Sequence, residues 1–180
     1  MAPDLPPVDS ALDAIRKLFS DARVAFKIVG GVAVVHHGYP RTTEDVDVLV
    51  ESATAERLQT ALGANGFERV SAARLRHTAT GVRVDLLVAG SPLPRTGAGS
   101  YPSPQALRGS SRDPDIVDLP GLLGLKVRAA RHRDLADVVE LLKRLDKEPY
   151  IEVEAAVDAA LRWDLARLRR DALEELAAGD

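Results

Sequence analysis

The sequence contains no cysteine, which excludes a disulfide framework and a zinc site with thiolate ligands. It also lacks an excess of positive charge. The 24 Lys and Arg against 27 Asp and Glu give a net charge of -3, so an extended basic surface for long nucleic acid is not expected. No apolar run is long enough to cross a bilayer, and MAPDLPPVDS lacks the basic start and apolar run of a signal peptide. These absences predict a soluble, cytoplasmic protein with no membrane partner.

Hydrophobic residues make up 46% of the 180 residues, which is enough apolar surface to form one compact core. We therefore expect a single domain over residues 1–180. Its parts are an α/β core over about 11–90, a flexible loop over about 90–114 that is rich in Gly, Pro and Ser, and a helical part over about 119–178. A short helix is expected in the loop after Ser103 and Pro104.

Apolar residues at helical spacing predict helices, and short β-branched runs predict strands. The expected helices are 11–22, with Asp9 and Ser10 as N-caps, and 32–37, 53–65, 121–131, 134–145, 152–161 and 164–177. The expected strands are 24–29, 44–50, 67–72, 74–78 and 82–88, with the last three as a meander. Strands mixed with helices in the first half predict an α/β or α+β fold with a C-terminal helical cluster.

Two acidic residues alternate with valines in the run EDVDVLV, which begins at Glu44. Because residues two apart share a face of a strand, Asp45 and Asp47 point the same way while the valines point into the core. Two converging carboxylates repel one another unless a cation lies between them, and hard oxygen ligands suit Mg²⁺. The alternative is a half-buried strand whose acidic face is simply solvated.

A glycine pair, Gly30 and Gly31, joins the expected strand 24–29 to the expected helix 32–37. A strand that turns through glycines into a helix presents backbone N–H groups and the positive end of the helix dipole, which together bind phosphate. The alternative is a tight turn that needs glycine only for its backbone angles.

A third acidic residue, Asp85, lies in VRVDLLV and shares a strand face with Arg83. A charge among apolar neighbours is costly to bury unless something pairs with it. A metal or an attacking hydroxyl would do so, and the alternative is a surface aspartate paired with Arg83 or Arg76 across the hairpin.

The order of the glycine pair, the Asp-x-Asp strand and the later strand aspartate resembles the DNA polymerase β-like nucleotidyltransferase superfamily. The segment LKVRAARHRDLADVVELL, residues 125–142, looks like the helix motif of the abortive-infection type nucleotidyltransferases, many of which are toxins of toxin–antitoxin pairs. The two motifs cover about two-thirds of the chain, from Val24 to Leu142. The resemblance implies a nucleotidyltransferase fold, a mixed β-sheet flanked by helices, with substrate held between the sheet and the helical tail.

The resemblance also implies roles for the residues that match its first motif. Gly30 and Gly31 would hold the phosphates of an NTP such as ATP. Asp45 and Asp47 would bind two Mg²⁺, and Asp85 would help to ionise the acceptor and share in metal binding. Nucleotidyl transfer is an in-line attack on the α-phosphorus with pyrophosphate leaving, and two metals stabilise the attacking and departing oxygens.

Basic residues of the second motif would neutralise the triphosphate. Lys126 is the first candidate, with Arg131 and Arg133 as further ones. Arg41 and Thr42 precede the acidic strand as similar residues do in the family, and they would touch phosphate or merely start the strand.

The segment 125–142 has two interpretations. If one helix continues through it, Lys126, Ala130, Arg133 and Asp137 fall on one face. The alternative is that Asp134 is an N-cap and Asp137 a first-turn acid, with the arginines solvated. His36 and His37 have no partner at metal-ligand spacing, so structural roles are expected for them. Trp163 is expected to pack in the core or at a helix junction.

The leading hypothesis is an active, Mg²⁺-dependent nucleotidyltransferase. Its acceptor would be an RNA end, such as that of a tRNA, or a protein hydroxyl, and a toxin role with an antitoxin partner would fit. Alternatives are transfer to a small hydroxyl compound such as an aminoglycoside, and a degenerate nucleotide-binding module without turnover. A cluster of Arg74, Arg76 and Arg83 beside Asp85 would favour an anionic acceptor.

Overall fold

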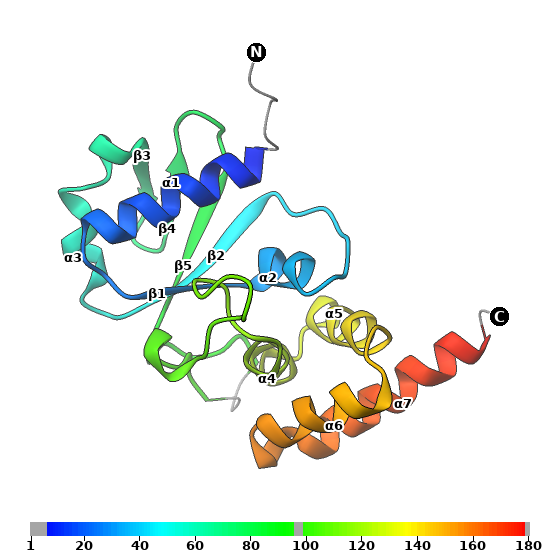
Figure 1. The fold of residues 1–180 in the computed structure, drawn as a ribbon. Coiled ribbons are helices and arrows are strands. Elements are labelled where there is room, and N and C mark those ends of the chain that lie inside the picture. The colour runs from blue at the N-terminus through cyan, green and yellow to red at the C-terminus, as the bar shows by residue number, and fades with distance from the viewer. Residues whose placement is uncertain (1–6, 96–98, 179–180) are drawn as a thin grey trace.

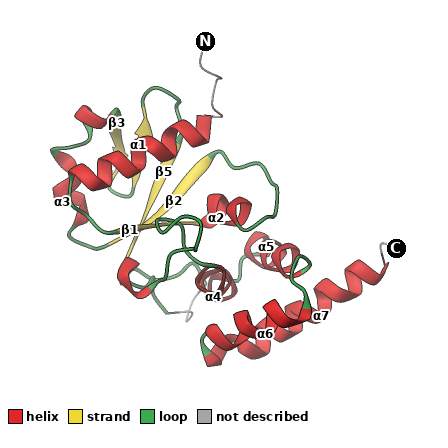
Figure 2. Cartoon of the chain, viewed as in Figure 1, coloured by secondary structure: helices red, strands yellow, loops and turns green. Residues whose placement is uncertain are grey.

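The computed structural model describes residues 7–95 and 99–178 and contains a five-stranded sheet with helices packed around it (Figures 1 and 2). The strands are β1 (Phe26–Val29), β2 (Asp45–Val50), β3 (Phe67–Ser71), β4 (Arg74–His77) and β5 (Arg83–Val88). The helices are α1 (Pro7–Asp21), α2 (Gly30–His36), α3 (Thr54–Gln59), α4 (Leu119–Ala129), α5 (His132–Leu142), α6 (Lys147–Ala156) and α7 (Arg162–Ala178). Short 3-10 turns are η1 (Gly63–Asn65), η2 (Pro104–Ala106) and η3 (Ala159–Leu161). The predicted mixed α/β class is confirmed.

The strand order in the sheet is β1-β2-β5-β4-β3. β1 runs antiparallel to β2, β2 runs parallel to β5, and β3, β4 and β5 form the predicted antiparallel meander. The parallel pair matters most for the site, because it brings two segments far apart in the sequence side by side. In the register of the β2–β5 pair, Asp47 lies beside Asp85 and Asp45 lies beside Arg83.

Alternation in β2 and β5 gives the sheet one apolar and one acidic face. In the parallel register the apolar face pairs Val46 with Val84, Val48 with Leu86, and Val50 with Val88. α1 covers this face, because the ring of Phe19 lies 4.7 Å from the ring of Phe26, a residue that pairs with Val50. Each such side chain that is fully buried contributes about 1.5–3 kcal/mol to folding. The three aspartates therefore lie on the opposite face of the sheet.

The helices α4 to α7 form the predicted C-terminal cluster, which lies beside the sheet in Figure 1. α5 packs on α4 and on α7, and α4 also contacts α2. Trp163 was expected to pack in the core or at a helix junction. Core packing is wrong, because the residue is 71% exposed, and it lies at the junction of η3 and α7. The neighbouring Leu165 and Leu168 face the core instead.

Two helix boundaries also differ from those expected. α1 begins at Pro7, so Asp9 and Ser10 lie inside the helix and are not its N-caps. Proline suits the first helical position, where a missing N–H removes no intrahelical bond. The expected helix 53–65 is divided into α3 and η1.

The expected loop 90–114 includes residues 96–98, which lie outside the described residues. The rest of it is held by backbone contacts. The expected short helix is present as η2, where the Ser103 hydroxyl accepts a hydrogen bond from the Gln105 N–H. Further on, the Ile28 N–H donates to the Asp115 carbonyl (2.8 Å) and the Val117 N–H donates to the Ile28 carbonyl (3.0 Å), so this segment continues the sheet beyond β1.

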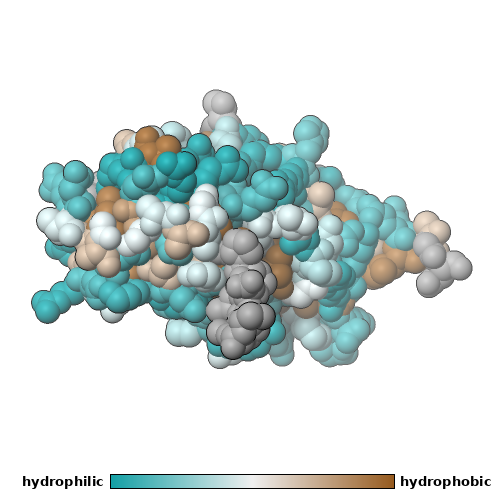
Figure 3. Space-filling view, turned by 90° about the horizontal axis from the view of Figure 1, so that it is seen from above, coloured by the Kyte–Doolittle hydropathy of each residue, from teal (hydrophilic) through white to brown (hydrophobic). Residues whose placement is uncertain are grey.

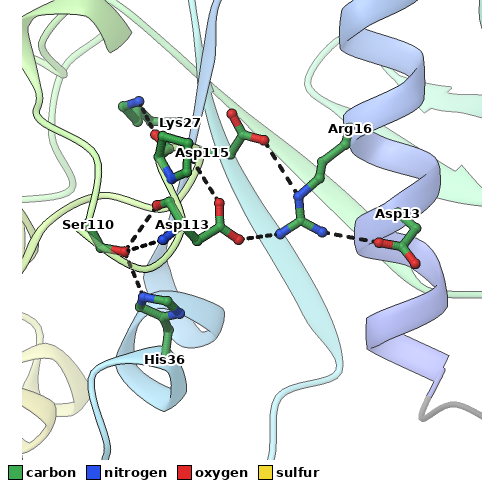
Figure 4. A network of polar contacts seen from close by, with 8 residues as sticks. Asp13, Arg16, Lys27, His36, Ser110, Asp113 and Asp115 are labelled. Atoms are coloured by element: carbon green, nitrogen blue, oxygen red, sulfur yellow. Dashed lines mark hydrogen bonds and ion pairs between the residues drawn. The ribbon is translucent and has the colours of Figure 1, made fainter.

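A polar network ties the same segment to α1 and α2 (Figure 4). Arg16 of α1 forms ion pairs with Asp113 at 2.5 Å and with Asp115 at 3.5 Å. His36 of α2 is hydrogen-bonded through Nε2 to the Ser110 hydroxyl at 2.8 Å. The predicted structural role of this histidine is therefore confirmed.

Hydrophilic residues dominate the face shown in Figure 3, where apolar residues occur as small separate patches. Among the helices described, none is both long and apolar enough to cross a membrane.

Candidate active site

A cavity of about 350 Å³ lies between the acidic face of the sheet and the helices α4 and α5. It gathers nine of the residues predicted from the sequence: Gly30, Gly31, Arg41, Asp45, Asp47, Asp85, Lys126, Arg131 and Arg133. Thr42 is exposed and does not line it. The cavity therefore lies between the sheet and the helical part, the region in which the family resemblance implies that substrate is held.

A larger cavity of about 520 Å³ shares one lining residue, Leu125, with the first. Its two carboxylates have structural partners. Asp118 accepts a hydrogen bond from the Gly121 N–H at the start of α4, and Asp158 accepts one from the Ala160 N–H at η3. Among the described residues that line this cavity, Asp118 and Asp158 are the only acidic ones.

The glycine pair lets the chain turn directly against the acidic strand. Gly30 has a φ of +62°, a left-handed conformation that suits glycine. A Cβ atom on Gly30 would lie 1.8 Å from Oδ2 of Asp47, and one on Gly31 would lie 2.8 Å from Nη2 of Arg41. The absence of side chains thus allows the Asp47 carboxylate to lie against Gly30 and the Arg41 guanidinium to lie against Gly31.

Asp45, Asp47 and Asp85 concentrate negative charge on one wall of the cavity. Burial raises the pKa of the Asp47 carboxyl above its usual value, and the charges of Asp45 and Asp85 raise it further, while Lys126 and Arg131 oppose the shift. The raised pKa means that nearby positive charges do not fully balance the negative charge of ionised Asp47.

The third aspartate is engaged by an arginine on the neighbouring strand. Asp85 lies opposite Arg74 in the β4–β5 register, and Arg74 donates from Nε to Oδ1 (2.5 Å) and from Nη2 to Oδ2 (3.1 Å). The sequence suggested Arg83 or Arg76 as the partner. Arg76 instead pairs with Glu68 on β3, and no ion pair of Arg83 is found within the described residues.

The two helices expected over 121–131 and 134–145 are present as α4 and α5, and the interpretation of 125–142 as one helix is wrong, because the chain breaks at Ala130. Ala130 has a φ of +49°, and Arg131 is extended before α5 begins at His132. Asp134 then lies in the first turn of α5 and does not cap it. The bend folds α5 back so that its acids meet Lys126 of α4.

Lys126 is buried, with 5% of its surface exposed, and contacts two buried acids. Its Nζ donates to Asp137 Oδ2 at 2.7 Å and to Asp134 Oδ1 at 3.3 Å. Burial would raise the pKa of Asp134, but the hydrogen bond from Arg131 and the charges of Lys126 and Arg131 lower it below its usual value. Lys126 is thus part of a buried ion network in the cavity wall.

Arg41 extends this network toward the glycine turn. Its Nε lies 3.2 Å from Asp137 Oδ1, in a geometry that does not make a hydrogen bond. The side chain is only 14% exposed. Three cations, Arg41, Lys126 and Arg131, therefore alternate with two acids and leave one net positive charge opposite the aspartates.

Some cavity residues were not predicted from the sequence. Tyr101 comes from the expected loop, where no periodicity marks it. Burial and the charges of Asp47 and Asp134 raise the pKa of its hydroxyl, while Arg131 opposes the shift. The apolar residues of the lining are Val29, Leu87, Leu93, Leu122, Leu125 and Ala129.

Carboxylate oxygens are the donors that Mg²⁺ prefers, and the uncompensated charge at Asp47 is one that a cation would balance. Within residues 7–95 and 99–178, however, no three acidic, histidine or cysteine side chains are grouped to hold an ion as they stand. At Asp85 both carboxylate oxygens accept hydrogen bonds from Arg74.

No protein-family model and no curated protein matches the chain. The solution structure of the antibiotic-resistance factor ANT(2'')-Ia matches with a TM-score of 0.53 and 13% identity, over 95% of this chain and 97% of that one. This likeness shows that the chain has a nucleotidyltransferase fold.

Two further structures are similar. The crystal structure of a proposed nucleotidyltransferase from H. pylori has a TM-score of 0.47 and 13% identity, with 96% of each chain covered. ANT(2'')-Ia in complex with adenylyl-2''-tobramycin has a TM-score of 0.46 and 12% identity, over 93% of this chain and 97% of that one.

Proposed function

We propose that this chain is a Mg²⁺-dependent nucleotidyltransferase, which transfers an NMP group from an NTP to a hydroxyl acceptor and releases pyrophosphate. One observation carries the proposal. Three aspartates form one wall of a cavity whose opposite wall presents Lys126, Arg131 and Arg133. A metal–triphosphate needs acids for the cation and bases for the phosphates, and this cavity offers both. Because both the sheet and the helical part line it, we also propose that residues 1–180 act as a single domain.

Asp45, Asp47 and, once free, Asp85 would hold the metal. When bound, Mg²⁺ supplies positive charge at the attacking and departing oxygens of the transfer. The chain's own groups would do the remaining work. The Arg41 guanidinium, which lies against Gly31, would bind phosphate there, and the net positive charge of the Lys126 network favours a triphosphate over a neutral ligand.

Asp85 would accept the proton of the acceptor hydroxyl as its oxygen attacks the α-phosphorus. The bond from the α-phosphorus to the bridging oxygen then breaks, and pyrophosphate leaves with that electron pair. No covalent bond to the protein forms in this scheme, so positioning and charge supply the rate enhancement.

For the acceptor we propose an RNA end or a protein hydroxyl, with a toxin role and an antitoxin partner as the biological setting. Arg83 supports an anionic acceptor, because it is exposed beside Asp45 in the register and has no ion pair within the described residues. A small hydroxyl compound is the second candidate. The fold likeness to an antibiotic-resistance factor favours it, and the pairing of Arg76 with Glu68 weakens the basic cluster expected from the sequence.

Labelled NTPs incubated with total tRNA, with the protein alone and with an aminoglycoside would test the proposal. We expect label transfer that requires Mg²⁺ and is lost in Asp45→Asn and Asp47→Asn proteins. Asp171→Asn is the matched control, because Asp171 lies on α7 outside the cavity. Transfer that survives the Asp47 change would contradict the proposed site. Label on the aminoglycoside alone would establish the second candidate, and growth arrest on expression that depends on Asp47 would support the toxin role.

A further inference from the structure

The three aspartates of the cavity differ in their pairing. Asp45 and Asp47 have no ion pair within the described residues, whereas Asp85 shares both oxygens with Arg74. A guanidinium in contact with both oxygens of a carboxylate repels a metal cation that approaches the same group. While this ion pair is present, Asp85 is therefore not free to bind a metal together with Asp45 and Asp47.

The Arg74–Asp85 pair is open to exchange. The Arg74 side chain is 44% exposed and that of Asp85 is 27% exposed. A phosphate group offers the same two-oxygen face to an arginine fork as a carboxylate does, with charge-assisted hydrogen bonds of similar geometry. An anionic ligand at this edge of the cavity would therefore compete with Asp85 for Arg74.

We propose that Arg74 is a specificity-determining residue, which releases Asp85 only when a phosphate next to the acceptor's reacting hydroxyl takes its guanidinium. The inference rests on the proposed function and names its acceptor class as a phosphodiester-bearing end. Exchange leaves neither partner unpaired, since Arg74 keeps an anion and Asp85 joins the acids that bind the metal.

The exchange also discriminates against cationic acceptors. A polyamine or aminoglycoside offers no anion to Arg74, so Asp85 would stay in its ion pair. Arg83 does not duplicate this role, because it lies beside Asp45 and Arg76 on the neighbouring strands and forms an ion pair with none of the three aspartates within the described residues. Arg83 therefore provides a matched control, an exposed arginine beside the acids that engages none of them.

Mn²⁺ binding measured by calorimetry tests the exchange without turnover. The proteins are the wild type and the Arg74→Gln, Arg74→Lys and Arg83→Gln variants. The probe is an RNA dinucleotide with a 3′-deoxy end, which has the phosphate but not the reacting hydroxyl. Because coupling is reciprocal, the dinucleotide should tighten Mn²⁺ binding by the wild type if it frees Asp85.

We expect Arg74→Gln to bind Mn²⁺ more tightly than the wild type, by up to about fivefold, the range of exposed ion pairs. The dinucleotide should then add nothing further, and Arg74→Lys should lie between the two proteins. Arg83→Gln should change the Mn²⁺ affinity less than Arg74→Gln does and, with the dinucleotide at saturation, should keep the response to it. In an Asp85→Asn background the gain from Arg74→Gln should vanish.

Equal Mn²⁺ affinity in the wild type and Arg74→Gln proteins would overturn the inference, and so would an equal gain from Arg83→Gln. A gain that persists in the Asp85→Asn background would overturn it as well, because the effect would then be one of net charge alone. The proposed function has a separate readout. If Asp47→Asn leaves Mn²⁺ affinity unchanged, the metal site itself is wrong and the inference falls with it.

Discussion

The buried Lys126 network predicts a large loss of stability when its central cation is removed. In Lys126→Met the side-chain stem keeps its length but loses the ammonium that contacts Asp134 and Asp137. Removing one partner of a buried ion pair costs about 3–5 kcal/mol, because a charge is left without compensation. Arg131 still bonds Asp134, and Arg41 stays 3.2 Å from Asp137, so we expect the lower end, about 3 kcal/mol.

Urea denaturation at neutral pH measures this loss. With a denaturant slope of about 2 kcal/mol per molar, the midpoint should fall by about 1.5 M. Lys143→Met is the matched control, since Lys143 also contacts two acids, Glu140 and Glu175, but these are 28% and 58% exposed. Screening by solvent should make its shift much smaller.

The same prediction has a pH dependence with a definite sign. Asp134 has a pKa held below its usual value in the folded protein, so the stability it contributes is present above its unfolded pKa and is lost as the pH falls through its folded pKa. The difference between wild type and Lys126→Met should therefore narrow in acid. A Lys126→Met shift no larger than that of Lys143→Met would refute the buried network. Adding Asp134→Asn and Asp137→Asn to Lys126→Met should restore stability, because these changes remove the two unpaired negative charges. A failure to restore stability would also refute the network.

Two further predictions concern the acidic wall. Because the pKa of Asp47 is raised in the folded protein, the stability that Asp47 contributes is full below its unfolded pKa and is lost as the pH rises through its folded pKa. Without metal, the Asp47→Asn protein should therefore melt at a higher temperature than the wild type at neutral pH and at a similar temperature in acid. A lower melting temperature than the wild type at neutral pH would contradict this. Gly30→Ala should lower the free energy of unfolding by about 1–2 kcal/mol, because alanine is strained in the left-handed backbone conformation of Gly30. It should also weaken Mn²⁺ binding, because the new Cβ would displace the Asp47 side chain. Gly81→Ala is the control and should show the backbone strain alone, because Gly81 has a φ of +74° and a Cβ there would meet nothing within 4 Å.

The sequence predicted the acidic wall because strand alternation is a local property. Asp45 and Asp47 share a face whatever the sheet order, and the φ of Gly30 is one that its residue type suits. The ion-pair partner of Asp85 was harder to predict from the sequence. It depends on the register of β4 against β5, which neighbouring turns and packing decide and which no residue of either strand marks alone.

Two helices were expected where α4 and α5 lie, but the break between them comes earlier than expected, at Ala130, where helix propensity does not mark it. Alanine is the best helix former, so nothing in the sequence marks Ala130 as the residue with a left-handed backbone. The ion contacts of Lys126 with the first turn of α5 accompany the bend and require the tertiary structure. Tyr101 was missed for a related reason, since a loop residue carries no periodicity that shows where it points.

The backbone pairing of 115–117 with β1 has a consequence for self-association. An open edge strand exposes unpaired N–H and C=O groups that invite pairing with another chain. At β1 the Asp115 carbonyl and the Val117 N–H occupy both hydrogen-bonding groups of Ile28. At the opposite edge, β3 has an irregular register between Arg69 and Ser71, and such bulges twist an edge away from a partner. A shortened 90–114 segment that pulled 115–117 away from β1 would therefore be expected to form β-linked aggregates through that strand.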